Sequence, residues 1–127
     1  MRQARRTFGK TAHAPTEARR FVSEYLDDSG LSDLRERIVL AVSELTTNAV
    51  THGSGPIDVT LDTTIDRLRV TVTDDGGGTP AMHRPDPPDN PEGGWGLHLV
   101  DTLADRWGAE RHDHRLVVWF EHGLNPP

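Results

Sequence analysis

Residues 42–53 read VSELTTNAVTHG, and two glycine-rich stretches follow later in the chain, DDGGG at residues 74–78 and GWGLHL at residues 94–99. Apolar residues recur at helical spacing through the first stretch and the residues before it. They predict a helix that begins after an N-cap at Ser32 and is stopped by Gly53. The apolar stripe of this helix consists of Leu34, Ile38, Val42, Leu45 and Ala49.

The segments around these stretches show helix and strand patterns in a simple order. The remaining predicted elements are, in chain order, an edge strand at residues 5–8, a helix from Pro15 to Ser29, a hairpin with strands at residues 57–61 and 68–72, a helix whose stripe runs from Leu97 to Trp107 and is closed by Gly108, and a hairpin at residues 110–112 and 116–120. This order predicts an α+β two-layer sandwich, in which a mixed, mostly antiparallel sheet carries its helices on one face.

One long segment fits neither pattern. Residues 79–93 contain prolines at positions 80, 85, 87, 88 and 91, so a regular helix or a central strand is excluded there. A loop of about 15 residues is long for so small a domain, and such loops are usually functional or mobile. The segment could therefore serve as a lid over a neighbouring site.

Composition narrows the class of protein. A chain of 127 residues, 34% hydrophobic and 27% charged, fits one globular domain spanning residues 1–127. No apolar run approaches the roughly 18 residues of a membrane helix. A formal net charge of −6 argues against a nucleic-acid partner. The absence of cysteine excludes disulfides and thiolate metal sites and suits the cytoplasm. Lys10 is the only lysine, so no lysine-bearing phosphate loop exists.

Glu44 and Asn48 form a polar pair at the margin of the first apolar stripe. They are four residues apart, so they face the same side of the helix. The pair could be a solvated helix edge. Alternatively, Asn48 could offer an amide oxygen to Mg²⁺, which takes oxygen ligands, while Glu44 acts as a base toward an attacking hydroxyl or water.

Asp74 ends a predicted strand just before three glycines. It could be a turn aspartate that stabilises a tight loop. Alternatively, it could accept a hydrogen bond from an adenine amino group, while glycines such as Gly76 and Gly78 let the backbone approach a flat ligand closely.

Gly94 and Gly96 precede Leu97 at the predicted start of the third helix. These glycines could simply make a flexible loop. The alternative is a phosphate cradle, in which free backbone N–H groups and the positive end of the helix hold the anion.

In this order, the three stretches resemble the N, G1 and G2 boxes of the GHKL ATPase superfamily, whose ATP site is the Bergerat fold. The sequence is most similar to the bacterial anti-sigma factor kinases, which are serine/threonine protein kinases of partner-switching systems. Residues 42–53, 96–101 and 103–108 carry this similarity, and it extends from about residue 11 to residue 121.

The resemblance implies ATP and Mg²⁺ as cofactors and a role for each motif. Asn48 is the implied Mg²⁺ ligand and Glu44 the implied catalytic base, with Asp74 contacting adenine in a pocket shaped by two glycines. The residues implied in nucleotide binding are Asn48, Asp74, Gly76, Gly78, Gly94, Gly96 and Leu97, with residues 79–93 as the ATP lid.

The resemblance also implies protein partners. Such kinases sequester a sigma factor and phosphorylate a small antagonist of the anti-sigma factor on serine or threonine, and they often act as homodimers. No nucleic acid or membrane partner is implied.

Two departures from related chains bear on the activity. Trp95 stands between the G2 glycines, where related chains often carry an arginine. Thr51 stands where sensor histidine kinases usually have a lysine, which argues against that class. A serine/threonine kinase is therefore the leading interpretation. The alternatives are a non-catalytic nucleotide-binding or pseudo-kinase module that sequesters a regulatory partner, and an ATPase subunit of another GHKL machine.

Overall fold

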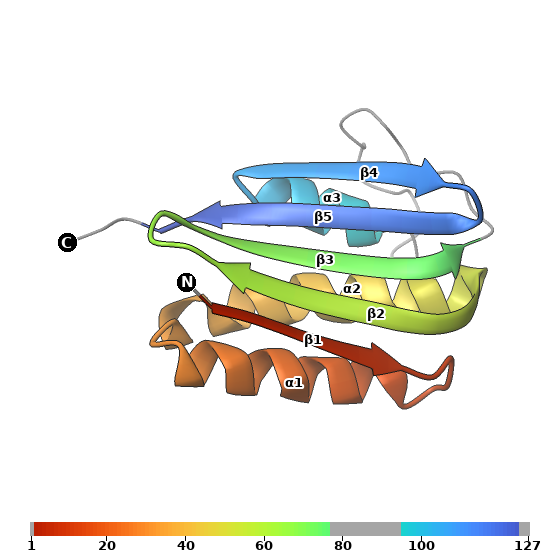
Figure 1. Cartoon of the computed structure of the whole chain (residues 1–127), viewed down its shortest axis with the longest axis horizontal. Coiled ribbons are helices and arrows are strands. Elements are labelled where there is room, and N and C mark those ends of the chain that lie inside the picture. Colours follow the sequence, from red (N-terminus) through yellow and green to blue (C-terminus); the bar gives the residue numbers. More distant parts are fainter. Residues whose placement is uncertain (1, 77–94, 125–127) are drawn as a thin grey trace.

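Five strands form one sheet in the order β1-β2-β3-β5-β4 in the computed structural model, which describes residues 2–76 and 95–124 (Figure 1). The elements are β1 (Arg2–Phe8), α1 (Ala14–Asp28), a 3-10 turn η1 (Ser32–Leu34), α2 (Arg35–His52), β2 (Gly53–Thr63), β3 (Arg67–Gly76), α3 (Trp95–Leu103), β4 (Arg106–His112) and β5 (Arg115–Gly123). The three described α-helices lie on one face of the sheet (Figure 1). The predicted α+β sandwich is confirmed, and every strand pairing in the described residues is antiparallel.

The core lies between the helices and the covered face of the sheet. Alternate residues of β2 and β3 point into it, and all of them are buried: Ile57, Val59, Leu61, Leu68, Val70 and Val72. The α2 stripe meets them as predicted, with Ile38, Val42, Leu45 and Ala49 all buried. The intervening strand residues lie on the opposite face, which no described helix covers (Figure 1). We call this the open face.

The start of α2 differs from the prediction. Ser32 lies in η1, and α2 begins three residues later at Arg35, without a side-chain cap. The Ser32 hydroxyl instead donates to Asp27 Oδ1 at 2.9 Å. Asp27 also accepts hydrogen bonds from Arg35 at 3.1 Å. The Ser32 side chain is therefore occupied in joining the end of α1 to the start of α2.

The predicted third helix is too long. α3 ends at Leu103, and Trp107 and Gly108 belong to β4. Trp107 Nε1 donates to Asp101 Oδ1 at 2.9 Å. Gly108 lies opposite Trp119 of β5, so close that an added Cβ would be 2.7 Å from the indole Nε1. The apolar spacing of Ala104 and Trp107 continues the helical pattern of α3, but residues 106–112 pair with β5 and form a strand instead.

β2 and β3 are also longer than predicted. β2 begins at Gly53, directly where α2 ends, and β3 extends to Gly76. The turn predicted at residues 54–56 is an irregularity within β2, where the register shifts between Ser54 and Asp58. Gly55 adopts a φ of +86° there, a conformation that favours glycine. Because β3 extends to Gly76, Asp74 lies inside this strand and does not end it.

No described helix is both long and apolar enough to span a membrane. The proposed lid at residues 79–93 lies outside the described residues.

Candidate functional site

The candidate site is built at the end of the molecule where α2 and β3 both finish (Figure 1). Glu44 and Asn48 lie one turn apart on α2, and both side chains are half-buried. Leu45 and Ala49 beside them are buried, so they fix which side of α2 faces the core. The polar pair therefore occupies the margin of the core, as predicted.

The described residues contain no group of three or more histidine and acidic side chains that could hold a metal ion by themselves. Mg²⁺ commonly binds through one or two protein oxygens together with the phosphates of its nucleotide. A lone amide oxygen from Asn48 fits that arrangement. Its role as a ligand stays a prediction.

Asp74 is the most unusual polar residue of the covered face. Its relative exposure is 7%. Its Oδ1 atom is buried and has no hydrogen-bond partner among the described residues. Burial, together with the neighbouring charge of Asp75, raises the pKa of Asp74, while the charges of Arg111 and Arg115 act in the opposite direction. The site therefore holds a carboxyl oxygen, Asp74 Oδ1, that accepts no hydrogen bond from the described residues.

Two neighbours of Asp74 offer no hydrogen-bond donor to Oδ1 within the described part of the chain. Its register partner on β5 is Leu116, whose side chain offers no donor. Just after α2, at the first residue of β2, the backbone of Gly53 lies so close that an added Cβ would be 2.9 Å from Asp74 Oδ1 and 2.7 Å from the carbonyl oxygen of Ala49. Glycine at position 53 thus allows the end of α2 to lie directly against the Asp74 carboxyl.

This arrangement fits an adenine nucleotide. An unpaired buried acceptor destabilises the folded protein by about 1–3 kcal/mol, and a ligand that donates a hydrogen bond removes that penalty. The adenine amino group is such a donor. Asp74 Oδ1 is therefore available for the contact that the sequence predicted, although the contact itself stays a prediction.

Sequence reasoning treated Gly53 only as a helix stop and did not single out Leu116 or Arg111. The register places Arg111, Leu116 and Asp74 in one row across β4, β5 and β3. Their strand pairing, which is non-local, was the missing information. The only local signal was Gly53, which closes an apolar helix and leads straight into a strand.

The predicted glycines are described only in part. Gly76 is the last residue of β3 and pairs with Gly53. Gly96 and Leu97 lie in α3, which is described from Trp95 to Leu103. Gly78 and Gly94 lie outside the described residues. The first N–H groups of a helix have no partner within it, so the start of α3 is suited to an anion.

The sequence pattern of the histidine kinase-like ATPase domain family matches residues 9–121, and the chain belongs to this family. Its resemblance to the GHKL superfamily is thereby confirmed.

Two solved structures share the fold. The RsbU and RsbW domains of Rv1364c from Mycobacterium tuberculosis match with a TM-score of 0.71 and 21% identity, over 99% of this chain and 34% of that one. The chain thus spans about a third of that neighbour. The catalytic domain of the histidine kinase ThkA matches with a TM-score of 0.60 and 19% identity, over 98% of this chain and 99% of that one. No curated protein matches the sequence.

Proposed function

We propose that this domain binds ATP with Mg²⁺ and acts as a protein serine/threonine kinase in transcriptional partner switching. It would sequester a sigma factor and phosphorylate the antagonist that releases it. Cytoplasmic location and homodimer formation belong to the same proposal. The observation that carries nucleotide binding is the buried Oδ1 of Asp74, which has no hydrogen-bond partner in the part of the chain that the structure describes, in a member of the histidine kinase-like ATPase family.

Each site residue has a distinct part in this proposal. Asp74 Oδ1 accepts the adenine amino hydrogen, which fixes the orientation of the nucleotide. Asn48 presents its amide oxygen to Mg²⁺ from the margin of α2. Bound ATP supplies the phosphoryl group. Glu44, half-buried one turn before Asn48, takes the proton from the attacking hydroxyl of the partner.

A second candidate is a nucleotide-binding module that captures its partner without phosphorylating it. Trp95, the first residue of α3, favours this alternative because related chains often supply an arginine there. A missing cation near the phosphates removes stabilisation of the charge that develops during transfer. Phosphate transfer to an antagonist protein distinguishes the two candidates.

Calorimetry of the full chain with ATP, with and without Mg²⁺, tests nucleotide binding, which both candidate functions require. Magnesium-dependent binding is expected, and Asp74→Ala should abolish it while circular dichroism shows an intact fold. Absence of binding in a folded wild-type sample would overturn both candidates for the isolated chain.

A further inference from the structure

Gly53 lies at the point where α2 ends and β2 begins, directly beside the Asp74 carboxyl. Its backbone is extended, with a φ of −89° and a ψ of 178°, a conformation that any residue adopts. The dihedral angles therefore do not require glycine here. Space does, because an added Cβ would lie 2.9 Å from Asp74 Oδ1 and 2.7 Å from the carbonyl oxygen of Ala49. A side chain at this position would displace the Asp74 carboxyl or the end of α2.

The close approach of Gly53 supplies Asp74 with no hydrogen bond. The Gly53 N–H group donates to the carbonyl oxygen of Ala49, which closes the last turn of α2. Asp74 Oδ1 stays buried and has no hydrogen-bond partner among the described residues. Gly53 thus helps to enclose this oxygen without donating to it.

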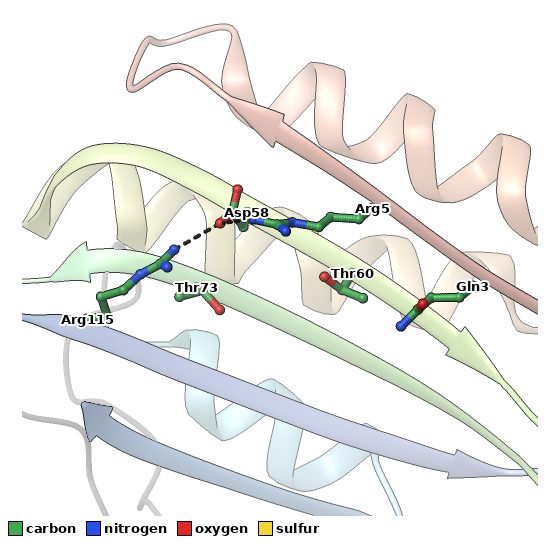
Figure 2. A pocket seen from close by; sticks show the side chains of 6 residues that line it. All are labelled: Gln3, Arg5, Asp58, Thr60, Thr73 and Arg115. Carbon is green, nitrogen blue, oxygen red and sulfur yellow. Dashed lines mark hydrogen bonds and ion pairs between the residues drawn. The ribbon is translucent and has the colours of Figure 1, made fainter. Parts of the chain in front are cut away.

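Asp58, an enclosed carboxylate on the open face, shows a different arrangement. Its side chain is 13% exposed, and its Oδ2 atom accepts hydrogen bonds from Arg5 Nη2 at 3.0 Å and Arg115 Nη2 at 2.9 Å (Figure 2). The Thr7 hydroxyl donates to Oδ1. Burial alone would raise the pKa of Asp58, but the hydrogen bonds from Thr7, Arg115 and Arg5 outweigh it and hold that pKa below its ordinary value.

Glu121 is arranged in the same way as Asp58. It is 5% exposed, and its Oε2 atom accepts hydrogen bonds from Arg67 Nη1 at 3.0 Å and Arg69 Nε at 2.7 Å. Asp74 differs from both, because its buried Oδ1 accepts no hydrogen bond from the described residues and burial raises its pKa. Within the described part of the chain, the fold thus supplies donors to two enclosed carboxylates and withholds them from Asp74 Oδ1.

We propose that Gly53 is a positioning residue that determines how the nucleotide site selects its base. Because it carries no side chain, the Asp74 carboxyl stays where Oδ1 can accept a hydrogen bond from the exocyclic amino group of a 6-aminopurine. This inference rests on the proposed nucleotide binding and adds a residue that sets its selectivity. Alanine at position 53 would move the carboxyl and so weaken the preference for the amino group.

Calorimetry of the full chain with two nucleotides in the presence of Mg²⁺ tests this role. The probes are ATP and purine riboside triphosphate, which has hydrogen in place of the 6-amino group. The wild-type protein should bind ATP at least about tenfold more tightly, as expected for a hydrogen bond to a charged group. Gly53→Ala should lower this ratio to below about threefold, because the acceptor is displaced. A general loss of stability or of phosphate binding acts on both nucleotides alike and leaves the ratio unchanged.

Gly108→Ala is the matched control. Its added Cβ would also lie 2.7 Å from a neighbouring atom, Trp119 Nε1, but this contact joins β4 to β5 and does not involve Asp74. The ratio should keep its wild-type value. Equal binding of both nucleotides by the wild-type protein, a folded Gly53→Ala protein with the wild-type ratio, or an equal fall of the ratio in Gly108→Ala would each overturn the role of Gly53 and leave nucleotide binding intact. Absence of binding for both nucleotides in a folded wild-type sample would overturn the proposed function as well.

A double-mutant cycle with Asp74→Ala tests the contact without nucleotide. In urea unfolding, Gly53→Ala should lower the midpoint more in the wild-type background than in the Asp74→Ala background, which lacks the carboxyl that the new methyl group meets. The cycle also decides the case in which Gly53→Ala does not fold or binds neither nucleotide, since the double variant should then recover stability. Equal lowering in both backgrounds, or no recovery in the double variant, would place the conflict at the Ala49 carbonyl and overturn the contact with Asp74.

Discussion

Replacing Asp74 with valine should stabilise the fold while it abolishes nucleotide binding. Asp74 lies on the covered face of β3, with buried Val72 two residues before it and Leu116 opposite it on β5. An unsatisfied buried acceptor destabilises a protein by about 1–3 kcal/mol. Valine, which is apolar and prefers strands, removes that penalty. A gain of about 1–3 kcal/mol should raise the melting temperature by about 4–11 °C in a domain of this size.

The pH dependence of the gain identifies its cause. Burial raises the pKa of Asp74 above its ordinary value of 3.8 in the folded protein. Between pH 3.8 and the raised pKa, the folded state binds more protons at Asp74 than the unfolded state does. The contribution of Asp74 to stability therefore falls as pH rises through that interval. The advantage of Asp74→Val should therefore be larger at about pH 8 than at about pH 4.5.

Urea unfolding of nucleotide-free protein at both pH values measures this difference. Asp62→Val is the control, because it makes the same substitution at a half-buried position on the open face of β2, where the carboxylate is not enclosed in the core. It should show only the β-propensity part of the gain, up to about 1 kcal/mol. Destabilisation by Asp74→Val, or a gain that is the same at both pH values, would refute the reasoning about the buried carboxyl.

Three further predictions concern other parts of the chain. Glu44→Ala should keep magnesium-dependent ATP binding but lower phosphate transfer by about 10²–10⁴-fold, measured with labelled ATP; undiminished transfer would remove Glu44 as the base. Gly108→Ala places a Cβ 2.7 Å from Trp119 Nε1 and should cost about 1–3 kcal/mol in urea unfolding, whereas Gly9→Ala, whose nearest neighbour is 3.9 Å away, should change stability by less than about 0.5 kcal/mol. The pKa of Asp58 is lowered in the folded protein, so its stabilising contribution is present above its ordinary pKa and is lost as pH falls through the folded pKa. Asp58→Asn should therefore reduce stability at neutral pH and make stability fall less steeply with decreasing pH in the acid range. An unchanged acid dependence would contradict this.

Local sequence patterns were sufficient for the element order and for the face that each element buries. The α2 stripe from Ile38 to Ala49 and the alternation in β2 and β3 depend on spacings of three, four and two residues along the chain. Gly53 stopped α2 as predicted. These spacings determine which residues can share a face, so they also placed Glu44 and Asn48 at the margin of the core.

Spacing could not decide between competing partners. The apolar pattern around Trp107 is compatible with a longer helix, but pairing with β5 places Gly108 under Trp119 and makes the segment a strand. Ser32 is a residue type that often caps a helix, but its hydroxyl donates a hydrogen bond to the Asp27 carboxylate instead. In both cases a tertiary contact overrode a local preference.

The sequence by itself determined the fold class, the family motifs and the candidate site residues, because these depend on periodicity and residue type. Only the tertiary structure decided that Asp74 Oδ1 is buried with no hydrogen-bond partner among the described residues, and that Arg5 and Arg115 meet on Asp58. Arg5 and Arg115 are separated from Asp58 by 53 and 57 residues. Strand pairing brings them together, and the environment of a charge depends on neighbours in space, which a local pattern does not contain.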